Sequence, residues 1–88
     1  MKHAGNAALD ELESLLKRLR EQNVLKERKR GVFYRGSAAF LHFHEDPAGL
    51  FADLRTEADW ERMPVNTAAE QRRLVAKIKA ALRKRHRF

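Results

Sequence analysis

The chain has no cysteine among its 88 residues, and it has only two prolines, four glycines and one tryptophan. Without cysteine it can form neither a disulfide framework nor a thiolate metal site. The leucines of residues 9–19 are interrupted by charged residues, and no apolar run reaches membrane-spanning length. We therefore expect no signal peptide and no membrane span, and we expect a small cytoplasmic protein of bacterial type, folded as a single domain over residues 1–88.

Charge of one sign is concentrated at particular places along the chain. The formal net charge is +7. Lysine and arginine prevail in residues 26–35 and 67–88, whereas the segment between them is acidic. A basic balance favours acidic partners such as nucleic acid, although it bears on solubility and non-specific attraction before it bears on function.

Two segments have the periodicity of amphipathic helices. Leu9, Leu12, Leu16 and Leu19 form an apolar stripe that predicts a helix over about 6–22, with Asn6 as its N-cap. A second helix is expected over about 67–84, because the sequence from Thr67 to Glu70 is a capping box and an apolar stripe follows it. The charged segment 26–30 is interpreted as a solvated connection, and the basic tail 85–88 is expected to fray.

Between the helices the apolar period changes from helical to alternating, which predicts strands near 32–35, 39–45, 50–55 and 60–65. Gly36-Ser37 suits a type II′ turn, and the segment 46–49 suits a type I turn with an aspartate that caps it. The segment 56–59 is polar enough for a third turn, and Pro64 limits the last strand to an edge. The predicted fold is α+β, a three- to four-stranded antiparallel meander (about 32–65) in the order αββββα, with both helices on one face.

The two turns fix which residues lie opposite each other in the expected sheet. The second turn places His42 opposite Asp53, and the first places Phe33 opposite Phe40. The apolar face, which includes Leu41 and Phe43, should be covered by the helices. The other face is then expected to carry the candidate ligand- or partner-binding residues Phe33, Arg35, Phe40, His42, His44, Phe51, Asp53 and Arg55.

The sharpest hypothesis for this second face is a divalent transition metal held by His42, His44 and Asp53. Neutral imidazole and carboxylate suit zinc, manganese or iron, and an open coordination position would permit hydrolytic or oxidative chemistry. The competing interpretation makes His42 and Asp53 a cross-strand hydrogen-bonded pair, with no cofactor.

Two further interpretations give the same face a binding role. Aromatic side chains on an open sheet, together with basic helices, could bind nucleic acid, or the face could bind a protein partner or form a homodimer. The two serines, Ser14 and Ser37, have no base placed beside them, so a nucleophile-based enzyme is not expected. The preferred expectation is a non-enzymatic binding domain for a partner or an acidic ligand, with the metal site as the alternative.

The hairpin also resembles a group of small uncharacterised bacterial α+β domains. The likeness depends on the order of four features: a strand with a glycine, a strand with the pattern His-x-His, a turn with a glycine, and an apolar strand with an aspartate. The matching residues are Gly36, His42, His44, Gly49 and Asp53. This arrangement is similar to the group that includes the so-called luciferase domain family. It covers about a quarter of the chain, lacks that group's later histidine-containing segment, and implies no particular activity.

Overall fold

A computed structural model describes residues 1–57 and 59–84 of the chain. None of the helices in these ranges is long and apolar enough to cross a membrane. The elements in chain order are β1 (Lys2–His3), α1 (Asn6–Glu11), α2 (Glu13–Arg20), β2 (Leu25–Lys29), β3 (Val32–Arg35), β4 (Ala38–Asp46), β5 (Gly49–Arg55), β6 (Trp60–Pro64) and α3 (Ala68–Arg83).

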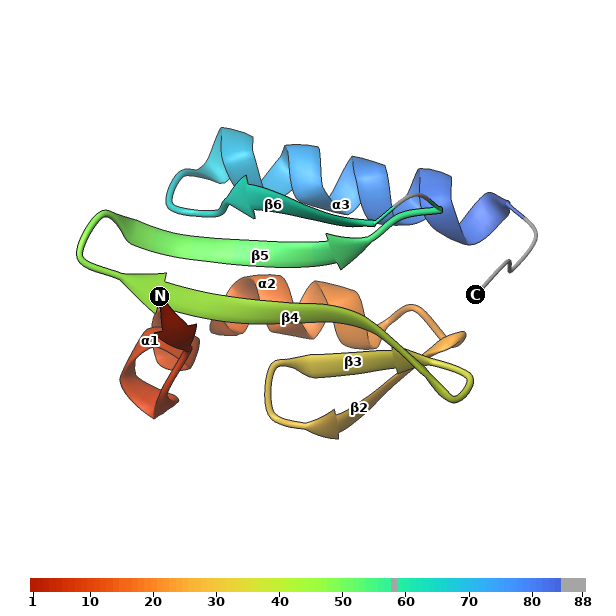
Figure 1. The fold of residues 1–88 in the computed structure, drawn as a ribbon, viewed down its shortest axis with the longest axis horizontal. Helices are drawn as coiled ribbons and strands as arrows, with labels where there is room; N and C mark the ends of the chain where they lie inside the picture. The colour runs from red at the N-terminus through yellow and green to blue at the C-terminus, as the bar shows by residue number, and fades with distance from the viewer. Residues whose placement is uncertain (58, 85–88) are drawn as a thin grey trace.

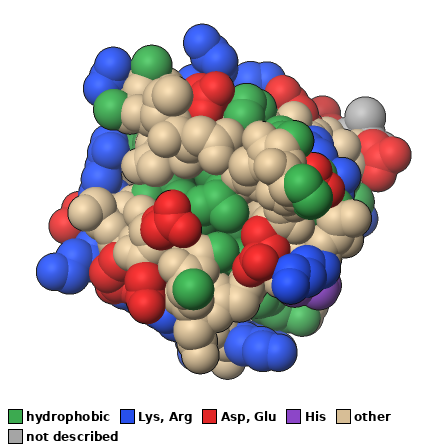
Figure 2. All heavy atoms as spheres, turned by 90° about the vertical axis from the view of Figure 1, so that its left-hand side faces the viewer, with side chains coloured by type: hydrophobic (Ala, Val, Ile, Leu, Met, Phe, Trp, Pro, Cys, Tyr) green, Lys and Arg blue, Asp and Glu red, His purple; other side chains and the backbone are tan. Residues whose placement is uncertain are grey.

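The strands form one antiparallel sheet in the order β2-β3-β4-β5-β6, and β1 pairs with β4 outside this path. The helices α2 and α3 lie behind the sheet, so that one of its faces is left open toward the viewer (Figure 1). In the end view of Figure 2, hydrophobic side chains are visible near the centre of the surface with acidic side chains beside them. The predicted α+β class, the antiparallel meander and the terminal helices are confirmed, but the sheet has two strands more than the largest number expected.

The leucine-rich helix is divided in two. Leu12 ends α1 and precedes α2, with φ −98° and ψ 6°, outside the usual helical range. All the leucines of the predicted stripe are nevertheless buried, and so is Leu15. The helical stripe was therefore right as a description of the buried face, although the continuous helix to residue 22 was not.

Strand β2 corrects the interpretation of residues 26–30 as a solvated connection. This segment lies at the edge of the sheet, where Leu25 alone is buried. Charged residues are tolerated in an edge strand, because such a strand has a neighbour on one side only and water reaches the other. The Glu27 carboxylate accepts hydrogen bonds from the Arg20 guanidinium and from the Gly31 amide, the second at 2.8 Å.

A bulge in β4 moves strand β3 onto a different register from the predicted one. The Gly36-Ser37 turn forms as expected. A type II′ turn needs a positive φ at its first central residue only, and Gly36 has φ +62° whereas Ser37 has no positive φ. Beyond the turn, however, Phe40 is an extra residue, so that Phe33 lies opposite Leu41. Because a shift of one residue exchanges the faces of a strand, Phe33 and Arg35 lie on the helix side.

The prediction of Asn6 as an N-cap is wrong, because Asn6 is the first residue of α1 and Gly5 occupies the cap position without a side-chain hydrogen bond. The second turn and the capping box of α3 agree with the sequence. The turn after β4 gives the predicted register, with His42 opposite Asp53, and the Asp46 carboxylate accepts a hydrogen bond of 3.0 Å from the Ala48 amide. Thr67 and Glu70 form the capping box at the start of α3. Ala58 of the third predicted turn and the tail 85–88 lie outside the described residues.

The core lies between the sheet and the helices. It is formed by the leucines of α1 and α2, by the apolar stripe of α3 and by one face of the strands. Its largest fully buried side chains include Phe33, Phe40, Leu41 and Leu54. The helices cover this face, so the opposite face of the sheet is the one left open.

Candidate metal site on the open sheet face

The open face is the side of the sheet that the helices do not cover. On each strand, alternation of side chains and the observed pairing place every second residue there. Most of its members are intermediate in exposure, Asp53 is buried, and His3 and Arg62 are exposed. The members are His3, Val32, Tyr34, His42, His44, Phe51, Asp53, Arg55, Trp60, Arg62 and Pro64.

Three histidines converge at the centre of this face. One potential ligand nitrogen from each of His3, His42 and His44 lies within 4.8 Å of the others. The Nε2 atom of His44 is 2.9 Å from Nδ1 of His42, and the rings of His3 and His44 are stacked at 4.8 Å between centroids. We call His3, His42 and His44 the histidine cluster.

His3 reaches the cluster because β1 occupies a free stretch of the edge of β4. His3 lies opposite His44 in the register of these two strands. The amide of Ala4 donates to the Phe43 carbonyl at 3.0 Å, and the amide of Gly5 donates to the Glu45 carboxylate at 2.7 Å. Sequence reasoning missed His3, because a strand of two residues has no periodicity to reveal it.

Asp53 lies beside the cluster but is already engaged. Arg62 donates to both carboxylate oxygens at 2.8 Å, and His44 Nε2 is 3.1 Å from Oδ2. The predicted opposition of His42 and Asp53 is confirmed in the register, although the carboxylate contacts His44 and Arg62. Asp53 is therefore placed to orient a histidine, and His3 replaces it as the third candidate ligand.

The electrostatics of the site favour the neutral form of the His42 imidazole. Burial lowers the pKa of His42, and the neighbouring His44 lowers it further. The hydrogen bonds from Arg62 lower the pKa of Asp53 against the opposing effect of its burial. A neutral ring keeps a lone pair for a metal ion, and an ionised carboxylate can accept a hydrogen bond from a ligating histidine.

Another nitrogen of the cluster is unsatisfied. Nδ1 of His44 is buried and has no hydrogen-bond partner among the described residues. A buried polar atom without a partner is uncommon and costs free energy, and a coordinating ion is one kind of group that relieves it.

Aromatic and basic side chains surround the cluster. The ring of Trp60 is 4.8 Å from that of His42, and the Arg55 guanidinium lies 5.4 Å from the Trp60 ring centroid. Farther along the face, Arg28 lies 4.5 Å over the ring of Tyr34. These contacts place a cation beside an aromatic ring at two points of the face, between β2 and β3 and between β5 and β6.

The structure brings together five of the eight predicted site residues and separates the other three. His42, His44, Phe51, Asp53 and Arg55 share the open face. The placement of Phe33, Arg35 and Phe40 with them is wrong because of the bulge, and Phe33 and Phe40 are at most 1% exposed.

Trp60 and Arg62 were missed although the sequence held a signal for them. The predicted turn at 56–59 is a hairpin with two residues in its loop. Counting outward from it along both strands places Asp53 opposite Arg62, as the structure does.

The chain matches no protein family model, and comparisons with curated proteins and with solved structures found no significant similarity. The resemblance based on Gly36, His42, His44, Gly49 and Asp53 therefore stays a prediction.

Proposed function

We propose that this chain is a small binding domain that holds a divalent transition metal ion on its open face, through His3, His42 and His44. The observation that carries the proposal is the convergence of three imidazoles from two paired strands, each with a nitrogen within 4.8 Å of the others. Around tetrahedral zinc, nitrogens lie about 3.3–3.4 Å apart, given zinc–nitrogen distances near 2.0–2.1 Å. The side chain of His3 is exposed, so a small rotation of it can bring the set together.

The donor set limits the choice of ion. Imidazole suits zinc, copper, nickel and iron, whereas calcium and magnesium prefer oxygen. Three histidines leave at least one coordination position for water or for a ligand from outside. Asp53 fits the role of a carboxylate that orients a ligating histidine, because it contacts His44 and is itself fixed by Arg62.

The test is a metal titration of the full chain after treatment with a chelator. Calorimetry with zinc is expected to show one ion per chain, and a zinc concentration about 100-fold above Kd should stabilise the fold by about 2.7 kcal/mol. Cobalt(II) in place of zinc should give the visible absorption of a low-coordinate nitrogen site. Copper(II) should quench the single tryptophan, since Trp60 adjoins His42.

Single substitutions separate this site from non-specific binding. His3→Ala changes an exposed residue of a short strand and should leave the fold intact while weakening zinc binding at least tenfold. His86→Ala removes the remaining histidine of the chain and serves as the matched control, with binding expected to be unchanged. Equal affinities of the wild type and His3→Ala, or the absence of stoichiometric binding, would reject the metal site.

A second candidate is the binding of an acidic ligand, in particular single-stranded nucleic acid, by the same face. It is favoured by the two arginine–aromatic pairs, Arg28 with Tyr34 and Arg55 with Trp60. Bases can stack on such rings while arginines contact phosphates, and the affinity then falls steeply with salt. Titration of a labelled oligonucleotide against the wild type and Trp60→Ala tests it, because stacking is worth about 1–3 kcal/mol per base. Equal binding by the two proteins would count against the stacking surface.

A further inference from the structure

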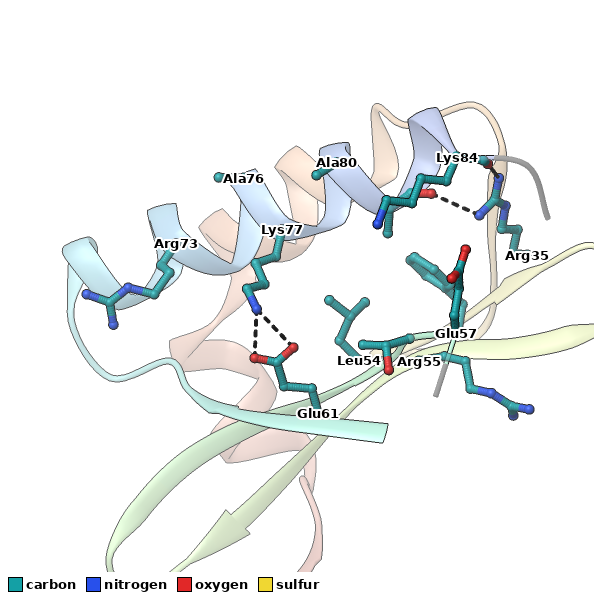
Figure 3. A pocket seen from close by; sticks show the side chains of 13 residues that line it. Arg35, Leu54, Arg55, Glu57, Glu61, Arg73, Ala76, Lys77, Ala80 and Lys84 are labelled. Carbon is teal, nitrogen blue, oxygen red and sulfur yellow. Dashed lines mark hydrogen bonds and ion pairs between the residues drawn. The ribbon is translucent and has the colours of Figure 1, made fainter. Parts of the chain in front are cut away.

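The side of α3 that faces away from the sheet carries charge of one sign. The helix lies behind the sheet, so this side is remote from the histidine cluster on the open face (Figure 1). Leu74, Val75 and Ile78 are buried in the core, whereas Figure 3 shows Ala76 and Ala80 on the opposite side of the helix. The exposed positions of α3 and its C-cap are Ala68, Ala69, Arg72, Arg73, Ala76, Lys77, Lys79, Ala80, Arg83 and Lys84.

These exposed positions form a line of alanines between two rows of cations. At 3.6 residues per turn, each row lies about 60° around the helix from the alanines. We call the alanines the alanine crest. The crest consists of Ala69, Ala76 and Ala80, one row of Arg72, Lys79 and Arg83, and the other row of Arg73, Lys77 and Lys84.

Most of the charge in the two rows is not compensated within the protein. Lys77 forms an ion pair of 2.9 Å with Glu61 on β6, but the other five cations form no ion pair within the described chain. The one carboxylate on α3, Glu70, is engaged in the capping box. Glu57 and Glu61 lie on the sheet side of the helix. The side turned away from the sheet therefore offers an uncompensated positive surface.

The cations at the other end of the chain are treated differently. Arg20 on α2 is paired with Glu13 and Glu27, and Arg30 is paired with Glu13 as well. On α3, by contrast, Lys79 and Arg83 are like charges four residues apart, which destabilises a helix. An external polyanion would relieve this repulsion, whereas α2 has no such need.

We propose that the alanine crest docks into the major groove of B-form duplex DNA, with the two rows of cations on the phosphates of the two strands. The major groove is about 12 Å wide and admits an α-helix, whose diameter with side chains is about 10–12 Å. Alanines at the crest let the helix enter deeply, and a row on each side matches the two backbones that border the groove. Because alanine side chains form no hydrogen bonds, affinity comes from phosphate contacts and depends little on sequence.

Other polyanions fit this arrangement less well. The major groove of A-form RNA is too narrow and deep for such a helix, and a single strand has one backbone rather than two. A helix that lies on an anionic membrane needs large apolar side chains on the face it buries, whereas this face has only alanines between its cations.

The test is a fluorescence anisotropy titration of the full chain with a labelled DNA duplex of about 20 base pairs. A chelator keeps the histidine cluster free of metal, so the result is independent of the proposed metal site. We expect a Kd of about 1–100 μM at physiological salt, and a slope of about −4 to −5 for the logarithm of the association constant against that of the salt concentration. The single strand and an RNA duplex of the same sequence should bind at least fivefold more weakly. Equal or tighter binding to either of them, or to vesicles of anionic lipid, would overturn the proposal.

Two double variants with the same loss of charge separate docking of α3 from general attraction. Lys79→Gln with Arg83→Gln should weaken duplex binding at least tenfold and reduce the salt slope by about 2. Lys26→Gln with Lys29→Gln is the matched control on β2, where both lysines are exposed and lie opposite residues of the open face. This control should keep the wild-type slope. An equal loss in the two double variants would assign the binding to net charge or to the open face, and would reject the docking of α3.

A bulky substitution tests the alanine crest itself. Ala76→Tyr should keep α3 from entering the groove and weaken duplex binding at least tenfold without changing the charge. Ala7→Tyr adds the same side chain at an exposed position of α1 and should leave binding unchanged. Circular dichroism confirms that each variant is folded. If Ala76→Tyr and Ala7→Tyr bind the duplex alike, the alanine crest is not the docking surface.

Discussion

Arg62 donates two parallel hydrogen bonds of 2.8 Å, one to each carboxylate oxygen of Asp53. The two residues lie opposite each other on β5 and β6, so the sheet itself holds this fork-shaped pair in register. The pair fixes the carboxylate that contacts His44. It also connects the edge strand β6 to the centre of the open face.

Replacing Arg62 should make Asp53 easier to protonate. The pKa of Asp53 is lowered by the hydrogen bonds of Arg62, so its contribution to stability is complete above the unfolded value near 3.8 and is lost as the pH falls below it. Arg62→Gln should raise the pKa of Asp53, measured by carboxyl NMR, and reduce stability at neutral pH. Arg72→Gln, on an exposed position of α3, is the control; an unchanged Asp53 pKa in Arg62→Gln would contradict this explanation.

The histidine cluster should make the metal-free fold sensitive to mild acid. The pKa of His42 is lowered by burial and by the nearby His44 and His3, while the Asp53 carboxylate opposes the shift and Arg62 adds to it. Since the unfolded chain then binds the proton more tightly, stability should fall as the pH drops below about 6.5. Urea unfolding at pH 7.5 and pH 5.5, with a chelator present, measures this loss.

The variant His42→Gln cannot acquire that charge and should show a smaller difference in stability between the two pH values. His86→Gln should keep the wild-type difference. The same pH dependence in His42→Gln as in the wild type would mean that another group is responsible.

Gly31 is expected to be intolerant of any side chain. Its φ of +79° lies in the left-handed region, and a Cβ built there would be 2.7 Å from a methyl carbon of Leu9. Gly31→Ala should therefore cost at least about 1–2 kcal/mol in the free energy of unfolding. Gly5→Ala is the matched control, because Gly5 has φ −82° and only an ordinary contact of 3.5 Å. Similar effects of the two substitutions would argue against the tight turn between β2 and β3.

The capping box should contribute measurably to α3. Thr67 accepts a hydrogen bond from the Glu70 amide at 3.1 Å, and the Glu70 carboxylate accepts one from the Thr67 amide at 3.1 Å. Thr67→Ala should lower the free energy of unfolding by about 0.5–2 kcal/mol, whereas Thr67→Ser keeps the hydroxyl and should lose less. Thermal and urea unfolding measure both, and an equal loss in the two variants would show that the hydroxyl is not the cause.

The parts of the fold that could be predicted from the sequence are those with a local chemical signal. Asp46 and Gly49 specify their turn, and Thr67 and Glu70 specify the start of α3. The alternation of residues 41–45 then assigns the core face of β4 correctly. These features depend on residues a few positions apart, which sequence patterns report well.

The rest depends on contacts between distant segments. The bulge at Phe40 buries an additional aromatic side chain under α3, and no local pattern indicates it. Strand β2 is charged on both sides because it is an edge, so alternation cannot reveal it. The same difference explains why only part of the site was predicted. His42, His44 and Asp53 lie in one hairpin, whereas His3 lies near the N-terminus, far from them in the sequence.

The short pairing of β1 with β4 means that any ligand bridging His3 and His44 would act as a cross-link across the first half of the chain. Such a bridge closes a long loop, and the closure removes chain entropy that the unfolded protein would otherwise keep. Because β1 is only two residues long, its docking is the step that a bridging ligand would favour most. Occupancy of the histidine cluster would then be coupled to the protection of the N-terminal amides from hydrogen exchange. The core between the sheet and the helices would hold the rest of the sheet whether or not a ligand is bound.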